Sequence, residues 1–182
     1  IVIFIVFLIL LFPMYKANSK VEVYYKIDET LPKTLESISS NNLIKEKFNI
    51  VSPEIILINK DIKNDKLSEL SSKLNEVDGI NLVLSKDTFN SLGLSTEMIP
   101  EELNSIFSNE KYSVIFVNSI YEVASDELNS QLTTINNLVK SYDKDAIVAG
   151  EGALMKDLIT ISDEVFNNVN TWSVICILII LV

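Results

Sequence analysis

Uninterrupted apolar runs stand at both ends of the chain, over residues 1–12 (IVIFIVFLILLF) and 172–182 (WSVICILIILV). A membrane-spanning helix needs about 20 apolar residues, so neither run spans a membrane alone as written. Because the chain opens on Ile rather than Met and closes within an apolar run, we expect two membrane helices of which it holds only a part. A signal peptide explains the first run less well, since no basic region precedes it and no small-x-small cleavage site follows it.

Buried core segments are the other alternative, but a globular protein rarely has such runs at both termini. Tyr15, Lys16 and Trp172 also suit the boundary between membrane and water. The pattern therefore predicts the end of a first transmembrane helix over residues 1–16, a domain over 17–171 and the start of a second transmembrane helix over 172–182. The flanks that would carry the positive-inside signal are not included, so these residues do not set the orientation.

Between the apolar ends, two hydrophobic periods predict a series of strands and helices. Residues 21–27 (VEVYYKI) alternate as in a strand, and Pro32 begins a helical pattern that reaches Phe48, with Leu35, Ile38, Leu43 and Ile44 apolar. From residue 53 the pattern predicts a strand over 54–59, a helix with Asp65 as N-cap and a strand over 80–84. A polar insertion over 85–108 follows, with a short helix from Glu101 to Phe107. After it we expect a strand over 112–118, a helix capped by Ser125 and a strand over 146–149 that is closed by Gly150.

The element order from residue 53 onward predicts the fold. It reads strand, helix, strand, strand, helix, strand, which is the split β-α-β arrangement of a ferredoxin-like domain. Right-handed crossovers then place both helices on one face of a four-stranded sheet. The predicted class is therefore α+β, a ferredoxin-like domain between two truncated transmembrane helices.

A helical period follows Gly152 and continues to the end of the chain. Apolar residues recur three to four positions apart, and neither Pro nor Gly separates them from the last apolar run: Leu158, Ile161, Val165, Phe166, Val169 and Trp172. We therefore expect one helix to run from the domain into the membrane. Such a joint would transmit motion, which a flexible Gly/Ser linker would not.

The charge of the chain excludes some classes of partner. It carries 25 acidic and 15 basic residues, a net charge of −10, and the basic residues are all Lys. Nucleic acids and anionic lipid headgroups both require basic surface, so neither is an expected partner. The only cysteine, Cys176, lies in the second apolar run, so no disulfide or thiolate metal site can form within the chain.

Candidate chemistry is sparse. With no His, the chain lacks Ser–His and Cys–His pairs and imidazole metal ligands. Three pairs of adjacent acidic residues occur: Glu101/Glu102, Asp126/Glu127 and Asp163/Glu164. Helix starts and solvated helix faces explain these pairs better than acid–base chemistry or calcium binding does, because the side chains of adjacent helical residues point in different directions. Gly150-Glu151-Gly152 lacks the third glycine of a dinucleotide site. We therefore predict no enzyme activity, and no catalytic, cofactor-binding or metal residues.

Asp157 leaves two interpretations open. It is expected at the start of the last helix, where the helix dipole favours a negative charge. Alternatively, its carboxylate locks this helix against the sheet or a neighbouring domain.

The order of the motifs resembles a transporter family. A membrane run is followed by LPKTLESISSNNLIKEKF (Leu31–Phe48), a split β-α-β domain and then G-x-x-A-x-x-x-D-L, formed by Gly150, Ala153, Asp157 and Leu158, which leads into a second membrane run. This resembles the first porter domain of the MMPL branch of the resistance–nodulation–division (RND) transporters, over nearly the whole chain.

The resemblance implies a multi-pass protein of the cell membrane that exports lipids or other hydrophobic compounds and is driven by protons. Residues 17–171 would lie on the extracytoplasmic side. Partners would be the bilayer, a second porter domain and the remaining transmembrane helices of the same protein. The motif Gly150, Ala153, Asp157 and Leu158 would be structural. Two other classes stay open: a ligand-sensing domain of a two-helix receptor, and a membrane-anchored enzyme, which the missing His and Arg disfavour.

Overall fold

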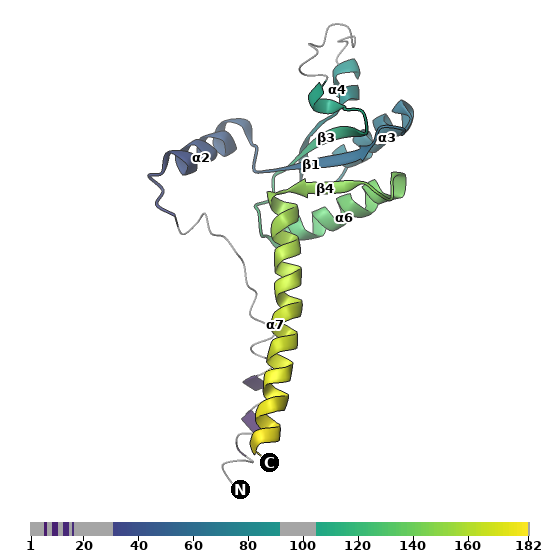
Figure 1. Ribbon diagram of the computed structural model, residues 1–182. Helices are drawn as coiled ribbons and strands as arrows, with labels where there is room; N and C mark the ends of the chain where they lie inside the picture. Colours follow the sequence, from purple (N-terminus) through teal and green to yellow (C-terminus); the bar gives the residue numbers. More distant parts are fainter. Residues whose placement is uncertain are drawn as a thin grey trace. The chain divides into compact units, whose positions relative to one another are not determined.

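The computed structural model describes residues 31–91 and 105–181, together with Val6, Ile9, Leu10, Pro13, Met14 and Lys16 (Figure 1). The chain divides into two compact units, a larger one over Lys26–Lys156 and a smaller one that includes Asp157–Val182. The strand predicted over 21–27 lies outside the described residues.

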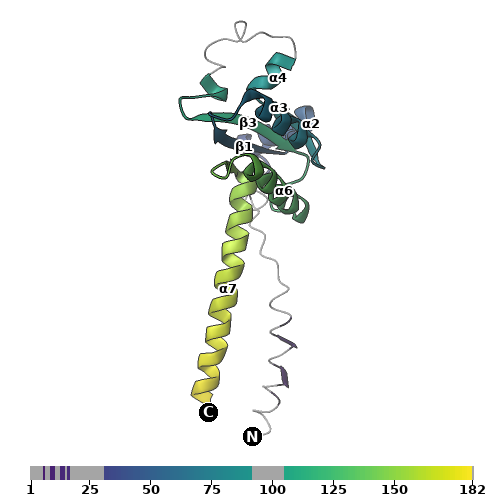
Figure 2. The ribbon, with the colours of Figure 1, turned by 90° about the vertical axis from the view of Figure 1, so that its right-hand side faces the viewer.

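A four-stranded antiparallel sheet forms the centre of the larger unit (Figure 1, Figure 2). Its strands are β1 (Ser52–Asn59), β2 (Ile80–Leu84), β3 (Tyr112–Ser119) and β4 (Ile147–Gly150), in the spatial order β2-β3-β1-β4. The neighbours β2 and β3, β3 and β1, and β1 and β4 all pair antiparallel. These four strands confirm the predicted ones, the last displaced by one residue, and the predicted α+β class is confirmed.

Two amphipathic helices cover one face of this sheet. They are α3 (Asn64–Asn75) and α6 (Asp126–Tyr142). The buried apolar residues of both helices pack in one core with alternate residues of the strands. Because Ile56 and Ile115 are paired across the sheet, their side chains lie on the same face. The strand members of the core are Ile56, Ile58, Ile115 and Val117, and the helix members are Leu67, Leu70, Leu74, Leu128, Leu132, Ile135 and Val139.

Helix starts test the predicted caps. Ser125 is the N-cap of α6 as predicted, because its Oγ accepts a hydrogen bond from the Leu128 amide at 3.2 Å. The prediction that Asp65 caps α3 is wrong: Lys63 occupies that position without a side-chain bond, and Asp65 lies in the first turn. The helix dipole stabilises a negative charge in the first turn, so Asp65 is favourable there as it would be at the N-cap.

The helix predicted from Pro32 is shorter in the structure. The helix α2 runs over Glu36–Phe48, and Pro32 lies in the preceding turn, where its carbonyl accepts from the Leu35 amide at 3.0 Å. None of the residues of α2, all of which are described, is buried. The apolar positions Leu43, Ile44 and Phe48 are therefore exposed, with Phe48 71% accessible.

The polar insertion contains a helix that the sequence analysis missed. The helix α4 (Lys86–Ser91) begins after Ser85, whose amide donates to Thr88 Oγ1 at 3.0 Å while the Thr88 amide donates to the Ser85 carbonyl. The bond from the Ser85 amide to the Thr88 side chain is one half of a capping box. Of the predicted helix from Glu101 to Phe107, the structure describes a helical turn at 105–107, and the preceding residues lie outside the described part.

The last helix is continuous, as predicted. The helix α7 runs over Glu151–Leu181, 31 residues, and follows β4 directly (Figure 1). It begins earlier than expected, so the first-turn acid is Glu151 and the predicted position of Asp157 at the helix start is wrong. Among the described residues, none of the helices combines the length and the apolar character needed to cross a membrane.

Candidate functional site

A buried glutamate lies where β4 ends and α7 begins. Glu54 is on β1 and is only 2% accessible, on the same face of the strand as the core residues Ile56 and Ile58. Its Oε1 accepts a hydrogen bond from the Gly152 amide at 2.8 Å, and its Oε2 accepts one from the Ala153 amide at 3.4 Å. These amides belong to the first turn of α7, which has no intrahelical partners for them. Glu54 therefore caps α7 from a different element.

Two opposing effects act on the Glu54 carboxyl. Burial raises its pKa above the ordinary value of 4.5, and the amide hydrogen bonds from Ala153 and Gly152 act in the opposite direction. The nearby charge of Glu151 raises the pKa further. The net result is a carboxyl that holds its proton to a higher pH than an exposed glutamate does.

Gly150 of the motif and the nearby Gly152 are both explained by their closeness to Glu54. A Cβ atom added at Gly150 would overlap the Glu54 carboxylate and lie 3.0 Å from the Pro53 carbonyl oxygen. A Cβ atom at Gly152 would overlap Glu54 Oε1 and lie 2.7 Å from Leu128 Cδ2. Glycine is required at both positions by this close approach, since neither has a positive φ.

The rest of the motif divides between two environments. Ala153 is half-buried and donates its amide to Glu54, and Lys156, one turn later on α7, donates to Thr133 Oγ1 of α6 at 2.5 Å. Asp157 and Leu158 are exposed, Leu158 at 39%. The structure thus brings Gly150, Gly152 and Ala153 together around Glu54, and it does not bring Asp157 or Leu158 to that cluster.

Of the predicted acidic pairs, Asp126/Glu127 occupies the first turn of α6, as expected for a helix start. Asp163 and Glu164 lie exposed on α7, and Glu101/Glu102 lies outside the described residues. Within the described ranges, no three His, Cys, Asp or Glu side chains are grouped closely enough to hold a metal ion.

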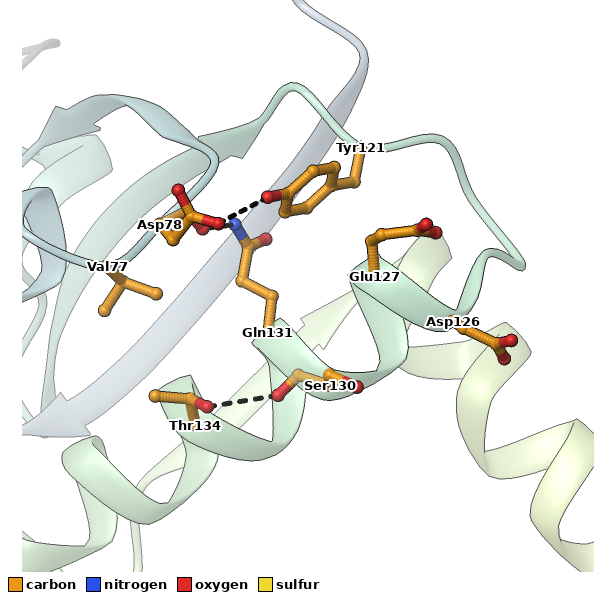
Figure 3. A pocket seen from close by; sticks show the side chains of 8 residues that line it. All are labelled: Val77, Asp78, Tyr121, Asp126, Glu127, Ser130, Gln131 and Thr134. Atoms are coloured by element: carbon orange, nitrogen blue, oxygen red, sulfur yellow. Dashed lines mark hydrogen bonds between the residues drawn. The ribbon is translucent and has the colours of Figure 1, made fainter.

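A pocket with several acidic and hydroxyl side chains lies beside the turn that joins α3 to β2 (Figure 3). Its volume is about 510 Å³, and it is lined by Val77, Asp78, Tyr121, Asp126, Glu127, Ser130, Gln131 and Thr134. These residues come from the α3–β2 turn, from the segment between β3 and α6, and from α6 itself. Residues that are 43 and 53 positions apart therefore meet in one pocket, which no local sequence pattern indicates.

Hydrogen bonds hold the residues of this pocket in place. The Tyr121 hydroxyl donates to Asp78 Oδ2 at 2.7 Å, and Gln131 Nε2 donates to the Asp78 carbonyl oxygen at 2.5 Å (Figure 3). The turn itself needs Gly79, whose φ is +79°. A Cβ atom there would overlap the Tyr121 ring and lie 2.8 Å from Gln131 Nε2.

Sequence reasoning missed both features. Residues 54–59 were predicted as an apolar strand and Glu54 was given no role, although Ser52, Glu54, Ile56 and Ile58 alternate along one face and place a glutamate inward. No sequence pattern predicted that Tyr121 and Gln131 would be the partners of Asp78. Comparison with models of known families and with curated proteins finds no match for the chain.

Proposed function

We propose that the chain is the first extracytoplasmic porter domain of a proton-driven RND/MMPL-type exporter of lipids or other hydrophobic compounds. The observation that carries the proposal is the direct connection between the last strand of the sheet, β4, and the long helix α7. The strand β4 passes at Gly150 into α7 without a linker, and α7 continues unbroken into the apolar run that begins at Trp172. A domain that works together with membrane helices needs such a joint, whereas a merely tethered module does not.

The sheet topology also supports this proposal. The order β2-β3-β1-β4, with antiparallel neighbours and with α3 and α6 on one face, agrees with a ferredoxin-like domain. On the opposite face Ile55 and Ile147 are 37% and 50% accessible. An apolar sheet face of this kind suits a partner domain of the same protein, as the second porter domain would be.

The capping of α7 by Glu54 fits the same role. A helix whose first turn is hydrogen-bonded to the centre of the sheet cannot fray separately from it. Gly150 and Gly152 permit that contact, which gives the glycine of the resemblance motif, Gly150, a physical reason.

Two experiments test the proposal: reading the complete gene from which this chain derives, and measuring lipid export in cells that lack this gene. The proposal expects several further hydrophobic spans and a second copy of this domain in the same reading frame. Cells without the gene should retain a fluorescent lipid that wild-type cells export, and a proton ionophore should abolish export. A parent protein with only two spans, or export unchanged by the deletion, would overturn the proposal.

Cys176 permits a matched test of topology, because it is the only cysteine of the chain. In intact cells a membrane-impermeant maleimide should leave Cys176 unlabelled. It should label a single cysteine placed at the exposed position Asn137 in a Cys176→Ser background. Labelling of the cysteine at position 137 only after cell lysis would place the domain in the cytoplasm and contradict the proposal.

A second candidate, the ligand-sensing domain of a two-helix receptor, is favoured by one observation, the pocket beside Asp78. A reading frame with two membrane spans and a cytoplasmic signalling module after residue 182 would support it instead.

A further inference from the structure

The pocket beside Asp78 is strongly biased toward hydrogen-bond acceptors. Of its eight lining residues, Asp78, Asp126 and Glu127 are acidic and none is basic. Its polar groups otherwise come from hydroxyls and one amide, while Val77 and the Tyr121 ring provide apolar surface. An anionic ligand would meet three carboxylates there, so the charge of the pocket favours a cation.

Gln131 provides a second and independent indication of a ligand. It is 5% accessible, and its Oε1 has no hydrogen-bond partner although it is buried. The amide cannot be reversed to correct this, because its Nε2 already donates to the Asp78 carbonyl oxygen. In Figure 3 the free oxygen points into the pocket, toward Tyr121 and Glu127. A buried carbonyl without a donor is costly, so a donor that enters the pocket would be bound favourably.

Tyr121 completes the environment. Its ring is held by the hydroxyl bond to Asp78 and packs over Gly79, so it offers an oriented aromatic surface at the pocket. The hydrogen bond to Asp78 raises the pKa of the Tyr121 hydroxyl, and the charge of Glu127 raises it further. Both effects indicate a negative potential at the ring, which stabilises a nearby cation.

A metal ion fits this pocket less well than an organic cation. Among the described residues no group of three acidic or other metal-binding side chains is close enough to coordinate one. A volume of about 510 Å³ is also in the range of small-molecule sites and far larger than a single ion requires.

We propose that this pocket binds a small primary ammonium compound, whose N–H groups donate to Gln131 Oε1 and to the Asp78 carboxylate while its hydrocarbon part lies on Val77 and Tyr121. Glu127 contributes charge at the rim. This site is independent of the proposed transport function, since binding is measured on the purified chain and needs no membrane gradient.

The test titrates the full chain, held in detergent micelles, with three probes of similar size in a calorimeter. Putrescine carries charge and N–H donors, tetramethylammonium carries charge alone, and 1,4-butanediol is neutral. Saturable binding of putrescine is expected, with the other two about tenfold weaker or undetectable. In a nitrogen-15 NMR spectrum, the side-chain amide of Gln131 should shift with putrescine.

Four variants test the assignment of the residues. Gln131→Met removes the acceptor at similar volume and should weaken putrescine binding about tenfold. Asp78→Asn and Glu127→Gln keep the shape and should weaken it by a smaller factor. Glu110→Gln changes the charge equally at an exposed position outside the pocket and should have no effect.

If Gln131→Met does not fold, Glu127→Gln and the NMR shift of Gln131 in the wild type still decide the question. The proposal is overturned if putrescine does not saturate, if its affinity is unchanged in Gln131→Met and Glu127→Gln, or if Mg²⁺ binds more tightly than putrescine and displaces it. An unpaired Oε1 that is satisfied only by water would give the first of these results.

Discussion

The two halves of β1 bury the same number of side chains on the same face, but with opposite chemistry. Toward Asn59 the buried residues are Ile56 and Ile58, and toward the start of the strand they are Ser52 and Glu54. The apolar half packs in the core with α3 and α6. The polar half meets Gly150 of β4 and the first turn of α7.

This contrast shows that buried side chains of one strand can stabilise the hydrophobic core and also the start of a neighbouring helix. Ile56 and Ile58 contribute through the area that they remove from water, which requires only apolar neighbours of suitable volume. Glu54 is buried because the amides of α7 need an acceptor there, which requires a side-chain oxygen in one geometry. The apolar half should therefore dominate stability, and the polar half should control how α7 is joined to the sheet.

The largest effect is expected from a charge placed in the apolar half. Leu132 on α6 is 3% accessible and belongs to the same core as Ile56, so Leu132→Asp buries an unpaired charge and should cost more than about 4 kcal/mol. Thermal unfolding followed by circular dichroism should show no cooperative transition. Asn137→Asp, at an exposed position of the same helix, should melt as the wild type does. A native melting temperature for Leu132→Asp would show that α6 faces the sheet differently.

Truncation of Ile56 tests the apolar half without introducing a charge. Its side chain is fully buried, so Ile56→Ala should lower the free energy of unfolding by about 3 kcal/mol. Ile55→Ala removes the same atoms from the opposite, partly exposed face and should cost less than about 1 kcal/mol. Urea unfolding measures both, and equal losses would contradict the assignment of the two faces.

Gly150→Ala tests the close approach in the polar half. The added methyl group would overlap the Glu54 carboxylate, so the strain should cost about 2 kcal/mol. Glu54→Asp shortens the acid and should recover part of that loss in the double variant, which a double-mutant cycle detects. Strictly additive losses would mean that Glu54 is not what excludes a side chain at position 150.

The smallest effect, and the one most specific to the polar half, is a pH dependence. Because the pKa of the Glu54 carboxyl is raised above 4.5, the folded state binds the proton more tightly than the unfolded state does. The free energy of unfolding of the wild type should therefore fall as the pH rises through the interval above 4.5. Glu54→Gln cannot titrate, so it should lose this dependence and be more stable than the wild type near neutral pH by about 1 kcal/mol.

Urea unfolding from pH 4 to pH 8 measures this difference. Glu110→Gln, which removes an exposed carboxyl, should leave the wild-type slope unchanged. If the wild type instead gained stability relative to Glu54→Gln as the pH rose, the amide hydrogen bonds of Glu54 would outweigh its burial.

Much of the fold was predictable from the sequence because its causes are local. Short apolar segments predicted the strands, three-to-four spacing predicted α6, Ser125 bonds an amide three residues away, and the lack of Pro or Gly kept α7 continuous. The errors at Pro32 and Asp65 concern helix starts, where neighbouring residues can serve almost equally well. The helix α4 was missed although its Ser85 and Thr88 pair locally.

The sites were decided by the tertiary structure. Glu54 and Gly152 are 98 positions apart, and Gln131 reaches the Asp78 carbonyl across 53 positions. The hydrophobic pattern of the sequence cannot predict such a pair, because the contact depends on which distant backbone segments the folded sheet brings together. The sequence by itself determined which residues form strands and helices, and only packing decided that a glutamate would cap α7 and that Gln131 would keep one oxygen free.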